Sequence, residues 1–294
     1  MGCCGPSARR LGRPAMFSFR QGNVAQPKPL ELAAAPDRGR LPLCRPQKRP
    51  ERPGCCLFLG RNDPVEYPDP GLYSQAEQLL LGNVPSWDNP DIVTNDWRPF
   101  RLMPESKITV HNYSPTVSAI NALVHFSISA FGIGMPRTLI ASKQISLAPS
   151  SQVDLFYPVP QAMLQGDQRV GVYIHVEHPV DTNYHNNDGA QVHDGSYTTE
   201  SGRSFALSIP VYNESNFTRQ ILLSVMPTDI IASVTPASHT FAPHEQIIAN
   251  LQIQVPAFLT GSSGSVINRG VTVVGRTSSG ELIGGATKLL RIDS

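Results

Sequence analysis

The sequence predicts an all-β protein, with two tandem Ig-like antiparallel β-sandwiches that follow a disordered basic N-terminal arm and one short helix. The composition supports this class: 27 prolines and 23 glycines accompany only 16% charged residues, which suits strands joined by turns. Apolar and polar residues alternate over strand-length stretches, most clearly between residues 120 and 130. A chain of 294 residues is also long enough for two domains with cores of their own.

The first segment, residues 1–64, is expected to be the disordered basic arm. Prolines and arginines recur through it, and its longest apolar run is 55–59. Such a segment buries too little apolar area to offset the entropy lost on ordering. Met16 is an alternative start, so the sequence leaves open whether residues 1–15 belong to the native protein. All five cysteines precede residue 57, and none forms a Cys-x-x-Cys zinc motif.

Residues 65–89 form a lead-in that contains the one expected helix. The turn-forming residues 67–71 come first, and residues 72–81 then read as a helix that Gly82 ends as a C-terminal cap. We expect its apolar face to dock on a sandwich or on a neighbouring subunit. The residues assigned to that face are Leu72, Ala76, Leu79 and Leu80.

The first sandwich is expected over residues 90–190, with the long alternating strand at its centre. The period of two in that strand predicts one buried and one solvent-facing side. The residues assigned to the buried face are Ile120, Ala122, Val124, Phe126, Ile128 and Ala130, with Leu123 and Phe131 opposite. The predicted strands lie near 91–95, 107–113, 118–131, 138–147, 152–157 and 168–177.

Several of these stretches resemble a known family. Pro90-Asp91-Ile92 leads into a strand, Lys107–Asn112 ends a strand at an asparagine, and Asp181–Asn187 closes with paired asparagines. This pattern resembles the bacterial cell-adhesion-related domain (CARDB-type), and the resemblance implies an Ig-like β-sandwich. The sequence departs from that pattern at Tyr113, Ser114 and His185, which puts a shared ligand in doubt.

Residues 191–202 are predicted to be a polar linker, and residues 203–294 a second Ig-like sandwich. The linker shows no apolar periodicity, whereas alternation resumes at Phe205. The stretch 234–245 resembles a corner of Ig-like modules that are appended to bacterial surface proteins and glycosidases. Ile248 is expected on the face opposite the buried one, where together with Leu123 and Phe131 it suits burial against another domain or subunit.

The polar stretch between residues 181 and 189 is the densest group of oxygen ligands in the chain. Its candidate Ca²⁺ ligands are Asp181, Asn183, Asn187 and Asp188. The stretch lacks the glycine and the terminal glutamate of an EF-hand loop, and Asn and Asp also close turns by bonding their own backbone. The sequence therefore favours a structural turn, with Ca²⁺ as the alternative.

No motif in the sequence indicates catalysis. There is no Gly-x-Ser-x-Gly, no Walker loop and no dinucleotide-binding glycine pattern, so we expect no enzyme and no cofactor. His185 and His193 are not spaced to aim at one metal ion, and His111, His125 and His175 are expected on solvent-facing or interface positions of strands.

The leading functional hypothesis is a non-enzymatic structural or adhesion protein that acts through protein–protein contacts, as a subunit of a larger assembly. The alternative is a carbohydrate- or peptide-recognition module that works beside an enzyme on another chain. A net charge of +1 gives no reason to expect nucleic acid as a partner. Without an apolar run of spanning length or a signal-peptide core, we expect a cytoplasmic or particle-associated protein, or one exported by a non-classical route.

Overall fold

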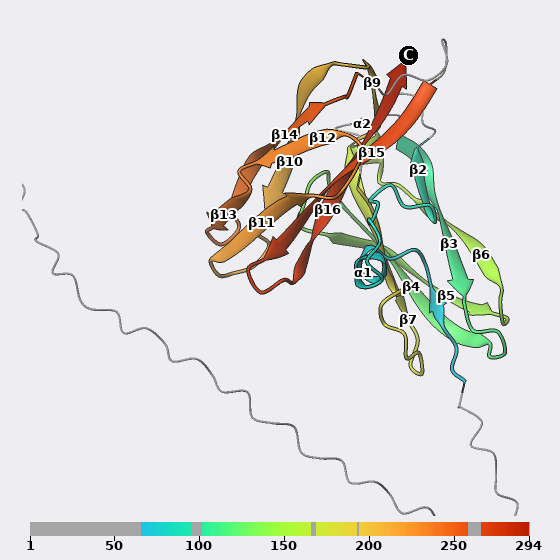
Figure 1. The fold of residues 1–294 in the computed structure, drawn as a ribbon. Coiled ribbons are helices and arrows are strands. Elements are labelled where there is room, and N and C mark those ends of the chain that lie inside the picture. The colour runs from blue at the N-terminus through green and yellow to red at the C-terminus, as the bar shows by residue number, and fades with distance from the viewer. Residues whose placement is uncertain (1–65, 96–101, 166–168, 193, 258–265, 294) are drawn as a thin grey trace, which may run out of the picture. The chain divides into compact units, whose positions relative to one another are not determined.

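The computed structural model describes residues 66–95, 102–165, 169–192, 194–257 and 266–293, drawn in colour in Figure 1. The predicted disordered arm, with its five cysteines, lies outside the described residues. None of the helices in the described part of the chain is long and apolar enough to cross a membrane.

The described residues confirm the predicted all-β class. The strands up to residue 192 are β1 (Pro70–Gly71), β2 (Ile92–Asn95), β3 (Leu102–Asn112), β4 (Ala119–Ala130), β5 (Thr138–Leu147), β6 (Gln152–Pro158), β7 (Val170–Glu177) and β8 (Asp188–Val192). Those that follow are β9 (Ser196–Glu200), β10 (Ser204–Tyr212), β11 (Arg219–Val225), β12 (Ile231–Thr235), β13 (Ser238–Phe241), β14 (Gln246–Gln254), β15 (Val266–Thr277) and β16 (Leu282–Asp293). The helices are α1 (Gln75–Leu80) and α2 (Gln161–Gln165), of which only the first was predicted.

The first sandwich is built from two antiparallel sheets. In one, β3 pairs with β6 on one side and with β1 and β2 on the other, and the second sheet has the order β5-β4-β7-β8. Their inner faces enclose a core in which Phe126 of β4 stacks on Tyr157 of β6 with ring centroids 4.8 Å apart. The alternating apolar side chains of β4 therefore face the opposite sheet, as the sequence predicts.

The second sandwich pairs a three-stranded sheet, β10-β14-β12, with a five-stranded sheet, β13-β11-β15-β16-β9. Its named strand pairs are antiparallel except β9 with β16. Residues 191–202, predicted to be a polar linker, form strands instead: they contain the end of β8 and all of β9. β9 lacks an apolar pattern because it is an edge strand on which Tyr197 is the member that packs against the core.

The start of β4 departs from the predicted register. Ile120, assigned to the buried face, is 55% exposed. The cause is a β-bulge: Asn121 has a φ of +62°, and the pairing with β5 shifts between Ala119 and Ala122. Beyond the bulge the predicted inward residues Val124, Phe126 and Ile128 are fully buried.

The end of β4 also differs from the prediction. Ala130, assigned to the buried face, is exposed, and Ser129, assigned to the solvent side, is buried. The next residue, Phe131, leaves the first sandwich and is buried in the second core. Two residues on, Ile133 is also buried there. Residues 131–133 are buried one after another, so from Phe131 on alternation no longer indicates which side of the chain is buried.

Helix α1 begins at Gln75, three residues later than predicted. Ser74 is its N-cap, and the side-chain hydroxyl accepts a hydrogen bond from the backbone N–H of Glu77 at 3.4 Å. Leu72 precedes the helix and is fully buried, whereas Leu80 is 66% exposed. The predicted shared face of Leu72, Ala76, Leu79 and Leu80 is therefore wrong, because the cap places Leu72 outside the helix.

The core of the second sandwich includes residues that precede it in the chain, among them Trp87 and Tyr173. The backbone N–H of Trp87, from the lead-in, donates to Thr287 Oγ1 of β16 at 2.7 Å. A Cβ on Gly285 would lie 2.6 Å from the Trp87 ring, so the indole rests directly on the backbone of β16. Beside this contact the fully buried Lys288 forms an ion pair with the buried Asp194.

Candidate functional site

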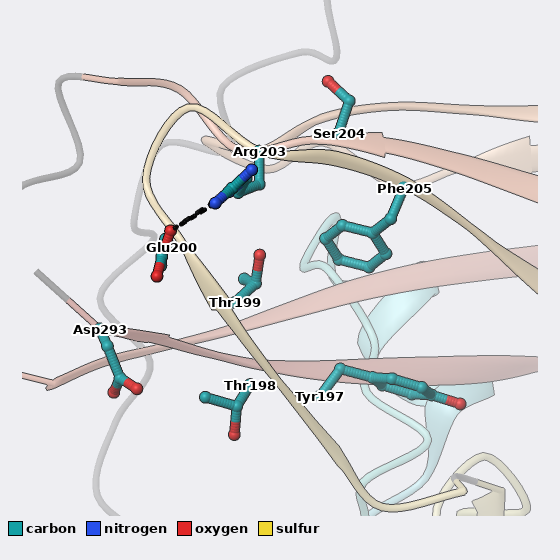
Figure 2. A pocket seen from close by; sticks show the side chains of 8 residues that line it. All are labelled: Tyr197, Thr198, Thr199, Glu200, Arg203, Ser204, Phe205 and Asp293. Atoms are coloured by element: carbon teal, nitrogen blue, oxygen red, sulfur yellow. Dashed lines mark hydrogen bonds and ion pairs between the residues drawn. The ribbon is translucent and has the colours of Figure 1, made fainter.

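A hollow opens between β9 and β10, the edge strands of the two sheets of the second sandwich (Figure 2). Its volume is about 510 Å³. The lining residues are Tyr197, Thr198, Thr199, Glu200, Arg203, Ser204, Phe205 and Asp293. A tight turn joins the two strands at the rim, where Gly202 adopts a φ of +80° that favours glycine. The hollow is therefore an opening between two sheets, next to the turn that links them.

The chemistry of this hollow suits binding. Arg203 and Glu200 form an ion pair at 3.1 Å across its mouth, and both side chains are well exposed, so the pair adds little stability. Tyr197 and Phe205 are half-buried and pack against the second core. Burial raises the pKa of Tyr197, and the nearby Asp194, whose Oδ2 accepts a hydrogen bond from the Tyr197 hydroxyl at 2.8 Å, raises it further. The Tyr197 hydroxyl is thus held neutral, as a structural donor.

The edge of β10 already receives an added segment at one end. The N–H of Ile133 donates to the Pro210 carbonyl, and the N–H of Tyr212 donates to the Ile133 carbonyl, each at 2.9 Å. In an antiparallel sheet the outward groups recur at every second residue. The N–H and C=O groups of Ala206 and Ser208 therefore point outward along the same edge.

The outer face of the sheet β10-β14-β12 carries no charged side chain. Its inner face is apolar, with Ile209, Ala249 and Leu251 buried. The register of the three strands places the other set of residues together on the outside. These residues are Ser204, Ala206, Ser208, Pro210, Tyr212, Ile231, Ser233, Thr235, Gln246, Ile248, Asn250, Gln252 and Gln254. We refer to this set as the uncharged face.

The residues predicted to face a partner have different environments. Leu72 and Phe131 are buried within the chain, in the first and second cores respectively. Leu79 and Leu123 are half-buried, whereas Leu80 and Ile248 are exposed. Ile248 belongs to the uncharged face. The contacts of Leu72 and Phe131 are therefore made within the chain itself, and a partner for the other four stays a prediction.

The polar turn keeps three of its four candidate Ca²⁺ ligands together. Asp181 and Asn187 are buried, and Asp181 Oδ1 accepts a hydrogen bond from the backbone N–H of Asn183 at 2.9 Å. Asp188 instead begins β8, is exposed, and pairs with His175 Nδ1 at 2.9 Å. The hydrogen bond to Asn183 is of the kind that a structural turn requires. Asp188 thus has a different partner from the other three candidates, and Ca²⁺ binding by the predicted set stays a prediction.

The histidines that the structure describes are not gathered with carboxylates into a metal centre. His193 lies outside the described residues, and His185 is exposed. His125 and His175 stack across β4 and β7 with centroids 6.0 Å apart, and each ring lies within 3.6 Å of Glu177. Within the part of the chain that the structure describes, no three His, Cys, Asp or Glu side chains are placed to hold one metal ion.

Two contacts near the candidate sites could not be predicted from the sequence. Asp69 lies in a Pro-Asp-Pro turn, and the fold brings it to Asn186, whose Nδ2 donates to its carboxylate at 2.7 Å. Asp194 lies in the stretch predicted to be a linker, and the fold pairs it with Lys288 of the last strand. In both cases the partner is distant in sequence, so residue spacing gives no indication of the contact.

Comparison with known proteins identifies no family. No protein-family model matches the chain, and no curated protein matches it. Among solved structures, it is similar to Escherichia coli alpha-2-macroglobulin activated by porcine elastase, at 8% identity and a TM-score of 0.28, over 79% of this chain and 22% of that one. A protein of unknown function from Porphyromonas gingivalis W83 gives 9% and 0.24, over 64% of this chain and 91% of that one. The Vibrio cholerae VesB protease gives 12% and 0.23, over 60% and 63%.

The chain thus spans about a fifth of the length of the alpha-2-macroglobulin that it resembles. TM-scores of 0.23–0.28 carry no argument about function. The all-β class is defined by the chain's own sheets, and functional inference has to start from its own surfaces.

Proposed function

We propose that this chain is a non-enzymatic protein that acts through protein–protein contacts of its Ig-like sandwiches, as a subunit of a larger assembly. The observation that carries the proposal is the uncharged face of the sheet β10-β14-β12. Charged residues are depleted in the cores of protein interfaces, because burying an unpaired charge is costly. A second copy of the chain is the partner to which we assign this face.

The contrast with the first sandwich supports this assignment. The exposed side of β3 and β6 carries Lys107 and Asp154, which form an ion pair at 3.0 Å. Charges of this kind protect a solvent-facing sheet from association. On the uncharged face, Ile248 and Ile231 are both more than half exposed among amide and hydroxyl side chains. A face with exposed apolar residues and no charge suits sheet-on-sheet packing between two copies.

The resemblance to bacterial cell-adhesion-related domains supports the same class of function. The motif residues that carry it have structural roles in the first sandwich. Asp91 accepts a hydrogen bond from the backbone N–H of Tyr73 at 2.7 Å, and buried Asn112 donates to the Val117 carbonyl at 2.8 Å. We propose that residues 90–190 are a divergent domain of this kind, with a role in adhesion or assembly.

Sedimentation velocity of the full chain over a wide range of concentration tests the proposal. We expect reversible association that weakens strongly in Ile248→Lys and Asn250→Lys, because each places a charge in the middle of the uncharged face. Thr240→Lys is the matched control, since it adds the same charge to an exposed position of β13 in the other sheet. A chain that stays monomeric throughout, or association that all three variants weaken equally, contradicts the proposal.

The hollow of Figure 2 favours a second candidate, a recognition module for an extended peptide. The edge of β10, one wall of the hollow, already accepts the segment at Ile133, so the same edge can accept a further strand at Ala206 and Ser208. A carbohydrate ligand is less well supported, because Tyr197 and Phe205 are committed to the core. Such a module stays monomeric, and amide hydrogen exchange at Ala206 and Ser208 slows when a peptide binds.

A further inference from the structure

The fold brings Asp69 of the lead-in against the polar turn that precedes β8. Asn186 Nδ2 donates to Asp69 Oδ1 at 2.7 Å, and Asn183 Nδ2 lies 3.4 Å from the same oxygen. The Asp69 carboxylate also lies close enough to Asp181 to raise the pKa of that group. Two carboxylates from distant parts of the chain therefore share one small polar region.

Asp181 is the central group of this region. It is 1% exposed, and its Oδ1 accepts the backbone N–H of Asn183, but its buried Oδ2 has no hydrogen-bond partner. Burial raises the pKa of Asp181 above its usual value. The nearby basic side chain of His178 acts to lower the pKa of Asp181, but its Nε2 lies 3.0 Å from the carbonyl oxygen of Ile120, and no ion pair joins it to Asp181. No cation among the described residues pairs with the Asp181 carboxylate.

The paired asparagines add two more unsatisfied acceptors. Asn186 is 1% and Asn187 5% exposed, and the side-chain Oδ1 of each is buried without a partner. The Asn187 side chain hydrogen-bonds the carboxylate of Asp181 and so acts to lower the pKa of that group, which leaves the amide oxygen of Asn187 as the atom without a partner. Buried acceptors without donors are rare in folded proteins, and each calls for an explanation such as an ion or a water molecule. Here they belong to two amide side chains that each contact one of the two carboxylates.

We propose that Asp69, Asp181, Asn186 and Asn187 form a Ca²⁺ site that ties the lead-in to the polar turn of the first sandwich. The donor set consists of carboxylate and amide oxygens, which hard cations prefer, and it contains no sulfur or imidazole. Ca²⁺ accepts mixed ligands in flexible geometry, whereas Mg²⁺ demands a near-ideal octahedron and retains several waters. The ion supplies the positive charge that the two carboxylates lack and a partner for the unsatisfied oxygens.

This site differs from the one that spacing in the sequence suggested. Asp188 is excluded by its pairing with His175, and Asp69 and Asn186 take part instead. The inference does not depend on the proposed function, since it concerns the first sandwich and the proposed interface concerns the second. The competing explanation is a proton on Asp181, which satisfies Oδ2 by making it a donor.

The test is Ca²⁺ binding to the full chain after removal of metal by EDTA, measured by titration calorimetry and by thermal unfolding. We expect saturable binding and a rise in melting temperature with Ca²⁺, as for any ligand that binds the folded state. Asp181→Asn and Asp69→Asn each weaken binding by at least roughly tenfold. Asp188→Asn is the matched control and keeps the wild-type Ca²⁺ increment.

Three results overturn the proposal: no binding of Ca²⁺ to the wild-type chain, binding that persists unchanged in Asp181→Asn, or binding lost in Asp188→Asn. If a variant does not fold, calorimetry of the wild-type chain still shows whether the protein binds Ca²⁺. Unfolding in Ca²⁺-free buffer gives a second measurement, in which Asp181→Asn raises the melting temperature because it removes a buried unpaired charge. A lower melting temperature for that variant counts against the site, since it shows that the wild-type oxygens are satisfied without an ion.

Discussion

We predict that the buried ion pair of Lys288 and Asp194 holds the two sandwiches together and that breaking it strongly destabilises the folded protein. Lys288 has no exposed side-chain surface, and its ammonium group lies 4.3 Å from the centroid of the Phe131 ring. Burial lowers the pKa of Lys288, while Asp194 opposes that shift. The Asp194 Oδ2 atom receives both Lys288 and the Tyr197 hydroxyl, and Oδ1 is buried without a partner.

The magnitude follows from what each substitution leaves behind. Asp194→Asn leaves the Lys288 ammonium buried without its counter-charge, and Lys288→Met leaves the Asp194 carboxylate with only the hydroxyl of Tyr197. Breaking a buried pair in this way typically costs about 3–5 kcal/mol. Replacing both partners by uncharged residues of similar size removes both unpaired charges, so we expect the double variant to be clearly more stable than either single variant.

The assay is urea unfolding of the wild type, both single variants and the double variant at neutral pH. The coupling free energy comes from the four midpoints and slopes as a double-mutant cycle. If the effects of the two single substitutions simply add in the double variant, the pair is not coupled and the reasoning fails. Single variants that lose less than about 1 kcal/mol would likewise show that water reaches the pair.

Two further predictions concern packing and pH. Gly285→Ala should destabilise by about 1–3 kcal/mol, because its Cβ would lie 2.6 Å from the Trp87 ring, whereas Gly270→Ala, whose Cβ would meet its nearest atom at 3.5 Å, should not; equal urea midpoints for the two variants would refute this. Because the hydrogen bond to Asp188 raises the pKa of His175 above 6.5, its contribution to stability is fully present below that pH and is lost as pH rises through the folded-state pKa. Asp188→Asn should flatten this part of the stability–pH curve, and an unchanged curve would show that the pair does not contribute.

Much of the fold is predictable because a half-buried strand leaves its period of two in the sequence. β5, for example, was predicted over its observed range, and β7 within two residues of its start. The inward residues of β4 from Val124 to Ile128 follow the same rule. In each case the information is local, since the strand has one face on a core and one in water.

The tertiary structure decided the features in which that condition fails. The bulge at Asn121 turns Ile120 to solvent, and a bulge adds a residue without changing the apolar pattern. Phe131 follows a strand of the first sandwich, but its side chain is buried in the core of the second. β9 was read as a linker because an edge strand needs few apolar residues.

The same limit applies to the candidate sites. The sequence placed Asp181 and Asn187 in one polar turn, which the structure confirms, because neighbours in the chain remain neighbours in space. It did not indicate the pairing of Asp188 with His175 or the contact of Asp69 with Asn186. Pairing of β7 with β8 sets Asp188 opposite His175, and the lead-in, whose Leu72 N–H donates to the Asn186 carbonyl, brings Asp69 to Asn186. Local sequence therefore determined which residues form strands and turns, and only the pairing of distant segments decided which oxygens meet.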